Sequence, residues 1–190
     1  MNKNVLGIIG LAFLVVAITA IQGKQTVNSE YEQNFKVGSL VCEYVRRAGE
    51  TDWELIEPCT HNLFTTVGKN WTRDVIGNWA GGGQAMKFIA TGNGSATQCT
   101  NAATLAGETP SGAWSGTYRT GSYAVNPAYN GNWTVSAVYT ANEAINGLNS
   151  TALFNASSSG TMFACNNFTT VNLIANDQLN ITWFLWVTEG

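Results

Sequence analysis

Charged side chains are scarce over most of this chain. Residues 75–190 contain only six, which are Lys87, Glu108, Arg119, Glu143, Asp177 and Glu189. Soluble domains normally stay apart through a surface of mixed charge, so a segment this poor in charge needs another cover. Glycans or neighbouring subunits can provide it. The same segment holds six of the seven Asn-x-Ser/Thr sequons of the chain, which favours a protein exposed on a cell or virion surface.

Other absences exclude whole function classes. The net charge of -3 leaves no basic stripe for a phosphate backbone, so we expect no nucleic-acid partner. His61 is the single histidine and no Cys-x-x-Cys pair occurs, so neither a zinc site nor any other metal or cofactor is expected. Glu108 and Glu143 are the one carboxylate pair of a glycosidase kind, among only four acidic residues after residue 75. The sequence therefore predicts a protein without catalytic activity.

The cysteines indicate an oxidising compartment. An even number in an exported chain favours two disulfides, although several pairings are possible. We expect Cys42 to pair with Cys59 in a local loop, and Cys99 to pair with Cys165 across the main domain. Reduced, buried cysteines are the alternative.

The N-terminal residues 1–22 are predicted to form a hydrophobic helix. Residues 5–21 contain no charge and no proline, and these 17 residues are at the short end of what spans a hydrocarbon core of about 30 Å. Two interpretations stay open. The segment is either a secretory signal, cut after Ala17 or Ala20, or a retained anchor or filament-core helix. Both require a membrane at least during export, and both place the rest of the chain outside the cytoplasm.

Residues 23–60 are predicted to form an extended arm and an acidic disulfide loop. The apolar residues between 25 and 46 show no helical spacing. The loop from residue 46 to residue 57 contains Glu50, Asp52, Glu54 and Glu57. Calcium can use such oxygen ligands, but no glycine-punctuated ligand pattern accompanies them. We therefore favour a solvated acidic loop between Cys42 and Cys59.

One amphipathic helix is predicted from Leu63 to Trp79. Its apolar residues recur at every fourth position, and they are Leu63, Val67, Trp71, Val75 and Trp79. Such a stripe is wide enough to dock on a sheet. Three consecutive glycines, residues 81–83, then end the helix.

Beyond Met86 the apolar residues alternate, which is typical of strands. The alternation is clearest over residues 86–90, 133–139 and 179–187. Phe184 and Trp186 lie on the second face of the last strand, so that strand needs cover on both sides. Glycines separate the strands at turn-like intervals. These patterns predict a mainly β fold, an antiparallel sandwich or barrel-like domain over residues 61–190.

Several segments of this domain resemble one family. Residues 61–77 (HNLFTTVGKNWTRDVIG) resemble the opening of a phage tail-fibre-like β domain that also occurs in archaeal surface proteins. Residues 87–92 (KFIATG) resemble its first core strand, residues 147–157 a small turn segment, and residues 160–183 its closing hairpin. The resemblance covers residues 61–190 and implies a β fold with an extracellular assembly role. The apolar N-terminus, the cysteines and the sequons depart from the phage pattern and fit export through a membrane.

The sequons are the candidate modification sites. Their asparagines are Asn70, Asn93, Asn132, Asn149, Asn155, Asn167 and Asn180. Modified sites belong on exposed faces, where a sugar can be attached and hydrated. Asn180 lies within a predicted strand and can face a neighbouring subunit, so we expect some sites to stay unmodified.

The function that fits these observations is that of a non-enzymatic structural subunit of an extracellular, glycosylated, pilus-like filament. Its partners are copies of itself, because an uncharged, aromatic-rich surface is what permanent interfaces favour. Assembly is expected to use apolar residues of the helix and the arm, in the manner of strand addition. These residues are Val5, Leu11, Phe13, Val15, Tyr31, Phe35, Val37 and Leu40.

Two alternatives stay open. The first is a virion spike or tail-fibre protein of an archaeal virus. The second is a glycan-binding adhesin, which would stack sugars on exposed aromatic side chains. The candidates for that role are Trp114, Tyr118, Tyr123 and Tyr129, and packing within the sheets is the other explanation for them.

Overall fold

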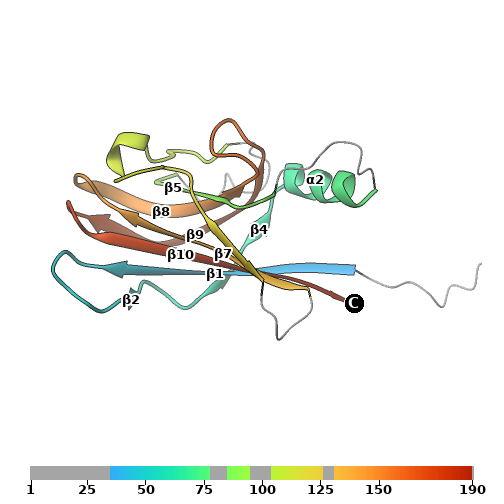
Figure 1. Cartoon of the computed structure of the whole chain (residues 1–190), viewed down its shortest axis with the longest axis horizontal. Coiled ribbons are helices and arrows are strands. Elements are labelled where there is room, and N and C mark those ends of the chain that lie inside the picture. Colours follow the sequence, from blue (N-terminus) through green and yellow to red (C-terminus); the bar gives the residue numbers. More distant parts are fainter. Residues whose placement is uncertain (1–34, 78–84, 95–103, 126–130, 190) are drawn as a thin grey trace, which may run out of the picture. The chain divides into compact units, whose positions relative to one another are not determined.

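Strands make up most of the chain that the computed structural model describes, which is residues 35–77, 85–94, 104–125 and 131–189 (Figure 1). All strand pairs in the named sheets are antiparallel. The strands form two open sheets, here called sheet A and sheet B. The predicted mainly β, antiparallel fold is confirmed in its sandwich form.

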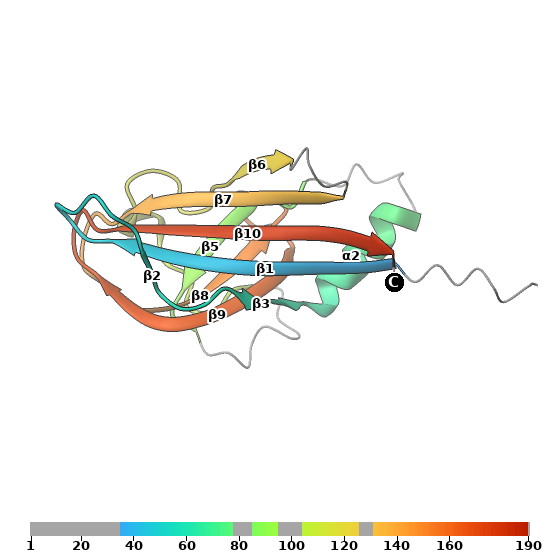
Figure 2. The ribbon, with the colours of Figure 1, turned by 90° about the horizontal axis from the view of Figure 1, so that it is seen from below.

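Sheet A contains strands from both ends of the described chain. Its order is β2 (Glu54–Leu55), β1 (Phe35–Arg46), β10 (Gln178–Glu189), β7 (Asn132–Thr140) and β6 (Ser122–Val125), and β3 (Thr60–His61) also pairs with β1. The β1–β10 pair is in register along its whole length, from Phe35 opposite Glu189 to Arg46 opposite Gln178. Figure 2 shows β1, β10 and β7 side by side.

Sheet B is built from the middle of the chain. Its order is β4 (Leu63–Phe64), β9 (Met162–Leu173), β8 (Ile145–Phe154) and β5 (Phe88–Gly92). Strands β3 and β4 are separated only by Asn62, so the chain crosses from sheet A to sheet B at that point. In Figure 2 the strands of sheet B run behind those of sheet A.

The main core lies between the sheets. Sheet A contributes Val41, Val135 and Trp183, which face each other across adjacent strands and are fully buried. Sheet B contributes Leu148 and Leu153 to the same cluster. The alternation of apolar residues in β7 and β10 predicted this inward face, because successive side chains of a strand point to opposite faces.

A second, smaller core covers the other face of sheet B. It consists of Ala90, Leu105, Ala152, Phe154, Met162 and Cys165. Leu105 comes from the segment 104–121, which runs over β8 together with the 3-10 turn Ser111–Ala113 (Figure 1). The Arg119 guanidinium lies 3.8 Å from the centre of the Phe154 ring, so a cation–π contact closes this cover.

The helix α2 is shorter than the sequence predicts. It spans Thr66–Gly77, whereas Leu63 and Phe64 pair with β9 as strand β4. Thr65 decides the boundary, since its Oγ1 accepts a hydrogen bond from the Gly68 N–H at 2.8 Å and donates one to the Met162 carbonyl at 2.7 Å. This side chain caps the helix and fixes it to sheet B. Residues 78–84, where the predicted helix ends, lie outside the described residues.

The segment predicted as an extended arm divides into two parts. Residues 23–34 and the predicted N-terminal helix lie outside the described residues, and a compact unit begins at Phe35. Residues 35–46 are extended, but they form β1 within this chain's own sheet A. Among the described residues, no helix is long and apolar enough to cross a membrane.

Candidate functional site

The most distinctive surface of the described chain is the outer face of sheet A, which is turned away from sheet B. Residues that pair directly across an antiparallel sheet share a face, so the register defines its members. The central positions of this face are Gly38, Leu40, Cys42, Tyr44, Leu55, His61, Ser122, Ala124, Asn132, Thr134, Ser136, Val138, Asn180, Thr182, Phe184 and Trp186. None of these side chains is an acid, a lysine or an arginine.

Large apolar side chains remain accessible on this face. Val138 is 52% exposed, Leu55 42% and Phe184 40%. Phe184 pairs with Leu40 on one side and with Thr134 on the other, so it stands near the middle of the sheet. Exposed apolar residues on a common face mark interaction surfaces more often than singly scattered ones do.

An aromatic contact organises one end of the same face. Trp186 lies over Gly38, where any side chain would collide with the indole ring. The ring of His61 meets Trp186 edge-on, with ring centroids 6.1 Å apart. Among the described residues, charged side chains on this face occur only at the ends of β1, as Lys36 and Arg46. The centre is therefore a neutral surface of aromatic, aliphatic, hydroxyl and amide groups.

The predicted assembly residues fall into two groups. Val5, Leu11, Phe13, Val15 and Tyr31 lie outside the described residues. Phe35, Val37 and Leu40 lie in β1, where they pair with Glu189, Val187 and Phe184. Because β10 already occupies that edge of β1, residues 35–46 are not available to add a strand to a neighbour there.

The sequon asparagines lie in different surroundings. Asn70 in α2 and Asn93 after β5 are exposed. Asn132 and Asn180 lie on the outer face of sheet A and are half-buried. Asn149 in β8 has a buried Oδ1 atom, and Asn155 accepts a hydrogen bond from the Thr161 N–H at 2.7 Å. Asn167 is half-buried in β9, so the two exposed sites are the most accessible of those described.

The disulfide predicted between Cys42 and Cys59 is confirmed. It joins β1 to the residue before β3 and closes the acidic loop. Cys165 is disulfide-bonded as well, and Cys99, its predicted partner, lies outside the described residues. Disulfides are consistent with an oxidising, extracellular environment.

The acidic loop is solvated in part. Glu50, Asp52 and Glu54 are exposed. Glu57 instead binds β9, since its Oε2 accepts hydrogen bonds from the Thr169 N–H at 2.8 Å and hydroxyl at 2.5 Å. No group of three metal-ligating side chains occurs within the described ranges.

Two carboxylates considered for catalysis have separate surroundings. Glu108 forms a bidentate ion pair with Arg119, at 2.5 and 2.7 Å. This partner raises the pKa of Arg119, although burial opposes it. Glu143 is exposed in the turn between β7 and β8. Glu108 is therefore held as one half of an ion pair.

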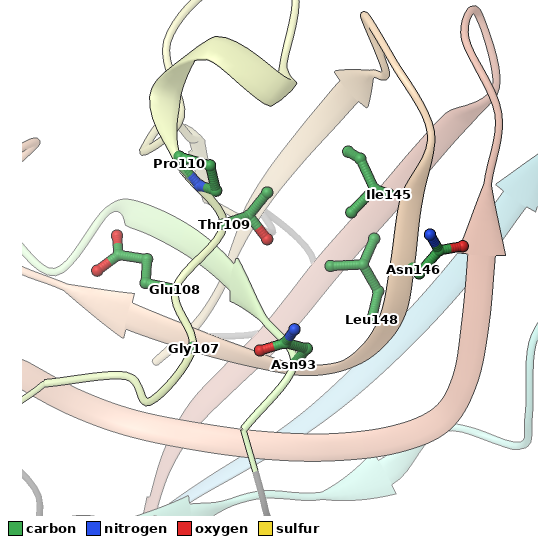
Figure 3. A pocket seen from close by; sticks show the side chains of 8 residues that line it. All are labelled: Asn93, Gly107, Glu108, Thr109, Pro110, Ile145, Asn146 and Leu148. Carbon is green, nitrogen blue, oxygen red and sulfur yellow. The ribbon is translucent and has the colours of Figure 1, made fainter.

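A cavity of about 300 Å³ lies beside this ion pair (Figure 3). Its walls are the segment 107–110 and the start of β8, including Ile145 and Leu148, and the exposed Asn93 stands at its edge. Because Arg119 engages Glu108, the lining offers amide, hydroxyl and apolar groups but no free charge.

The aromatic cluster considered for sugar binding is not exposed as a group. Trp114 is only 2% exposed and packs on Tyr139 in the main core, with ring centroids 5.0 Å apart. Tyr118 packs partly buried against the same core. Tyr123 is exposed, and Tyr129 lies outside the described residues. For Trp114 the other explanation, packing within the sheets, is therefore the one that holds.

The fold defines the class of this protein as a two-sheet antiparallel β sandwich with a neutral outer sheet face. No family model matches the chain, and neither a curated protein nor a solved structure matches it.

Sequence reasoning missed a polar group in the core. Glu43 in β1, Thr60 in β3 and Asn166 in β9 meet between the sheets. The signal that could have found them is an acidic residue at an inward position of an apolar strand, since Val41 and Val45 flank Glu43 at a spacing of two.

Proposed function

We propose that this chain is a non-enzymatic structural subunit of an extracellular, glycosylated filament, whose partners are copies of itself. The N-terminal apolar segment and the neutral surface of the sandwich are its means of assembly. The observation that carries the proposal is the outer face of sheet A, which lacks charge at every central position and exposes Val138, Leu55 and Phe184.

The chemistry of that face favours a permanent protein partner. An apolar patch left in water lowers solubility, whereas the buried centre of a stable interface is depleted in charge and enriched in aromatic residues. Phe184 and Trp186 provide the aromatic groups, and Thr134, Ser136 and Thr182 provide neutral hydrogen-bonding groups. We assign a second copy of the chain as the occupant of this face. The same sequence contains a further apolar segment, residues 5–21, which assembly with other copies would also bury.

Three further observations support an extracellular location for the assembly. The disulfides fit an oxidising compartment. Asn70 and Asn93 are exposed sequon sites that a glycosylating system could modify. The resemblance of residues 61–190 to tail-fibre-like domains of surface proteins agrees with the same role.

The test is negative-stain imaging and intact mass of the full chain recovered from the cell surface or culture fluid. Regular fibres are expected, together with a mass that shows which residues and glycans are retained. Val138→Lys places a charge on the outer face and should abolish the fibres. Ile174→Lys is the matched control, because Ile174 is 63% exposed in the turn between β9 and β10.

Discrete particles or monomers of the wild type would overturn the filament proposal. Particles would favour the virion protein, and monomers that bind a glycan array would favour the adhesin. Fibres that survive Val138→Lys unchanged would keep the filament but remove the outer face of sheet A as its interface.

A further inference from the structure

Three polar side chains from three strands meet between the two sheets. The Asn166 Nδ2 atom in β9 donates hydrogen bonds to the Thr60 Oγ1 atom in β3, at 2.8 Å, and to the Glu43 Oε1 atom in β1, at 3.2 Å. Glu43 and Thr60 belong to sheet A and Asn166 to sheet B. One amide nitrogen therefore brings a hydroxyl and a carboxyl group together.

Two of the three side chains of this cluster are buried, and Thr60 is half-buried. Glu43 is fully buried and Asn166 is 6% exposed. The Glu43 Oε2 atom has no hydrogen-bond partner among the described residues. A buried carboxylate with an unpaired oxygen is costly to a fold, so its presence calls for an explanation.

Glu43 is also suited to move a proton near neutral pH. Burial raises its pKa from 4.5 to about 7, the Asn166 hydrogen bond opposes the rise, and the negative charge of Glu57 adds to it. A group with a pKa near the working pH is effective both as a general base and as a general acid.

The three groups are the parts of an acyl transfer. Thr60 supplies a hydroxyl nucleophile, Asn166 an acyl carbon bearing an amide leaving group, and Glu43 a proton carrier. Their shared contacts hold the reactants together without loss of translational freedom, which can accelerate a reaction of this kind strongly.

We propose that Thr60 and Asn166 form an autocatalytic intramolecular ester cross-link, with Glu43 as the catalytic acid and base. The Thr60 Oγ1 atom attacks the Asn166 Cγ atom, and Glu43 accepts the hydroxyl proton. The Cγ–Nδ2 bond then breaks as Glu43 returns that proton to the leaving nitrogen. One ester and one ammonia molecule form, Glu43 is regenerated, and no oxidant or co-reactant is consumed.

The cross-link joins the sheets where the chain is already tied. Thr60 directly follows Cys59, whose disulfide reaches β1 through Cys42. The ester adds a covalent connection from there to β9. A mechanical force that separates sheet A from sheet B would therefore act on covalent bonds at this point, and not on hydrogen bonds alone.

The first measurement needs only the wild-type protein. The full chain is reduced, alkylated, freed of glycans, digested and analysed by tandem mass spectrometry. The expected product is a linked pair of peptides, one containing Thr60 and the other Asn166, lighter than their sum by one ammonia molecule. Mild alkali should separate them and leave aspartate at position 166. Linear peptides with Thr60 and Asn166 unchanged would overturn the proposal.

Variants then distinguish the ester from other losses of ammonia. Thr60→Val keeps the shape but removes the nucleophile, and it should abolish the linked pair, whereas Thr60→Ser should retain it. Glu43→Gln should reduce the yield severely. If the peptide that contains Asn166 is still lighter by one ammonia molecule in Thr60→Val, Asn166 has closed a ring with its own backbone. That result would overturn the proposed cross-link. Thermal unfolding of each variant verifies that it folds.

Discussion

Gly68 is the residue at which α2 approaches β9 most closely. A side-chain carbon there would collide with the backbone carbonyl of Phe163. Alanine in a helix is normally more stable than glycine by about 1 kcal/mol, but overpacking against a backbone that cannot move costs about 1–3 kcal/mol. We therefore expect Gly68→Ala to lower the free energy of unfolding in a urea titration.

The neighbouring Lys69 provides the control for this prediction. It is exposed in the same turn of α2, and Lys69→Ala should change the stability by less than about 0.5 kcal/mol. A Gly68→Ala protein that is as stable as the Lys69→Ala protein would contradict the close packing of α2 on β9.

Glu43 makes stability depend on pH in an unusual direction. The ordinary pKa of this carboxyl group is 4.5, and in the fold burial raises it to about 7. Below pH 4.5 the Glu43 carboxyl is protonated in both the folded and the unfolded state, and its full contribution to the free energy of unfolding is present. This contribution is lost as the pH rises through 7. The loss amounts to about 3 kcal/mol, since each pKa unit corresponds to about 1.4 kcal/mol.

The measurement compares the free energy of unfolding with and without Glu43→Gln between about pH 4.5 and 8, the window that this pKa shift defines. Both proteins carry Thr60→Val, so the result does not depend on the cross-link. The difference between the two should shift in favour of the Glu43→Gln protein as the pH rises. The pKa of Asp177 is lowered in the fold as well. This group is present in both proteins, so its contribution to the pH dependence cancels in the comparison. A difference that does not vary with pH would contradict a protonated Glu43 in the fold.

At the scale of elements, the disulfide Cys42–Cys59 stabilises the short strands β2 and β3, which are too short to be stable without it. Strands β2 and β3 have two residues each, and both depend on β1. The bond closes a loop with a sequence separation of 17, for which removal costs about 2–4 kcal/mol. Replacing both cysteines by serine should therefore lower the melting temperature.

Hydrogen exchange locates that loss within the fold. Faster exchange is expected in β2 and β3, while β7 and β10 should exchange as in the wild type, because their mutual pairing does not involve the loop. Uniformly faster exchange in all strands would show that the bond stabilises the whole sandwich instead.

The elements that could be predicted from the sequence are those that are buried on one face only. Strand β7 alternates between buried and accessible residues over much of its length, so its period was visible. Residues 150–154 of β8 are buried without alternation, because the segment 104–121 covers the second face of sheet B. Such a strand has no polar face to reveal it.

The start of α2 and the place of β1 could not be predicted for a different reason. Leu63 and Phe64 fit the helical stripe, and only their pairing with β9 makes them a strand. In β1, Lys36, Glu43 and Arg46 interrupt the apolar pattern, yet β10 pairs with the whole segment. Long-range pairing decided both cases, and a local pattern carries no information about it.

At the scale of the whole molecule, two covers compete for the outer face of sheet A. A neighbouring copy and glycans on Asn132 and Asn180 cannot occupy it together, because both asparagines share that face and Asn180 pairs directly with Val138. If filament formation buries this face, glycopeptide mass spectrometry of assembled material should find Asn70 and Asn93 modified and Asn132 and Asn180 bare. Modified Asn132 and Asn180 in intact fibres would show that sugar covers the face.

An engineered sequon makes the same competition a direct test. Val138→Asn creates an Asn-Tyr-Thr sequon on the outer face of sheet A, and Ile174→Thr creates an Asn-Leu-Thr sequon at the exposed Asn172. In protein that is glycosylated at the new site, the Val138→Asn variant should form no fibres, and the Ile174→Thr variant should form them as the wild type does. Since each variant adds one glycan to an exposed position, bulk and solubility change alike and only the face differs. Fibres formed by glycosylated Val138→Asn protein would place the subunit interface elsewhere on the molecule.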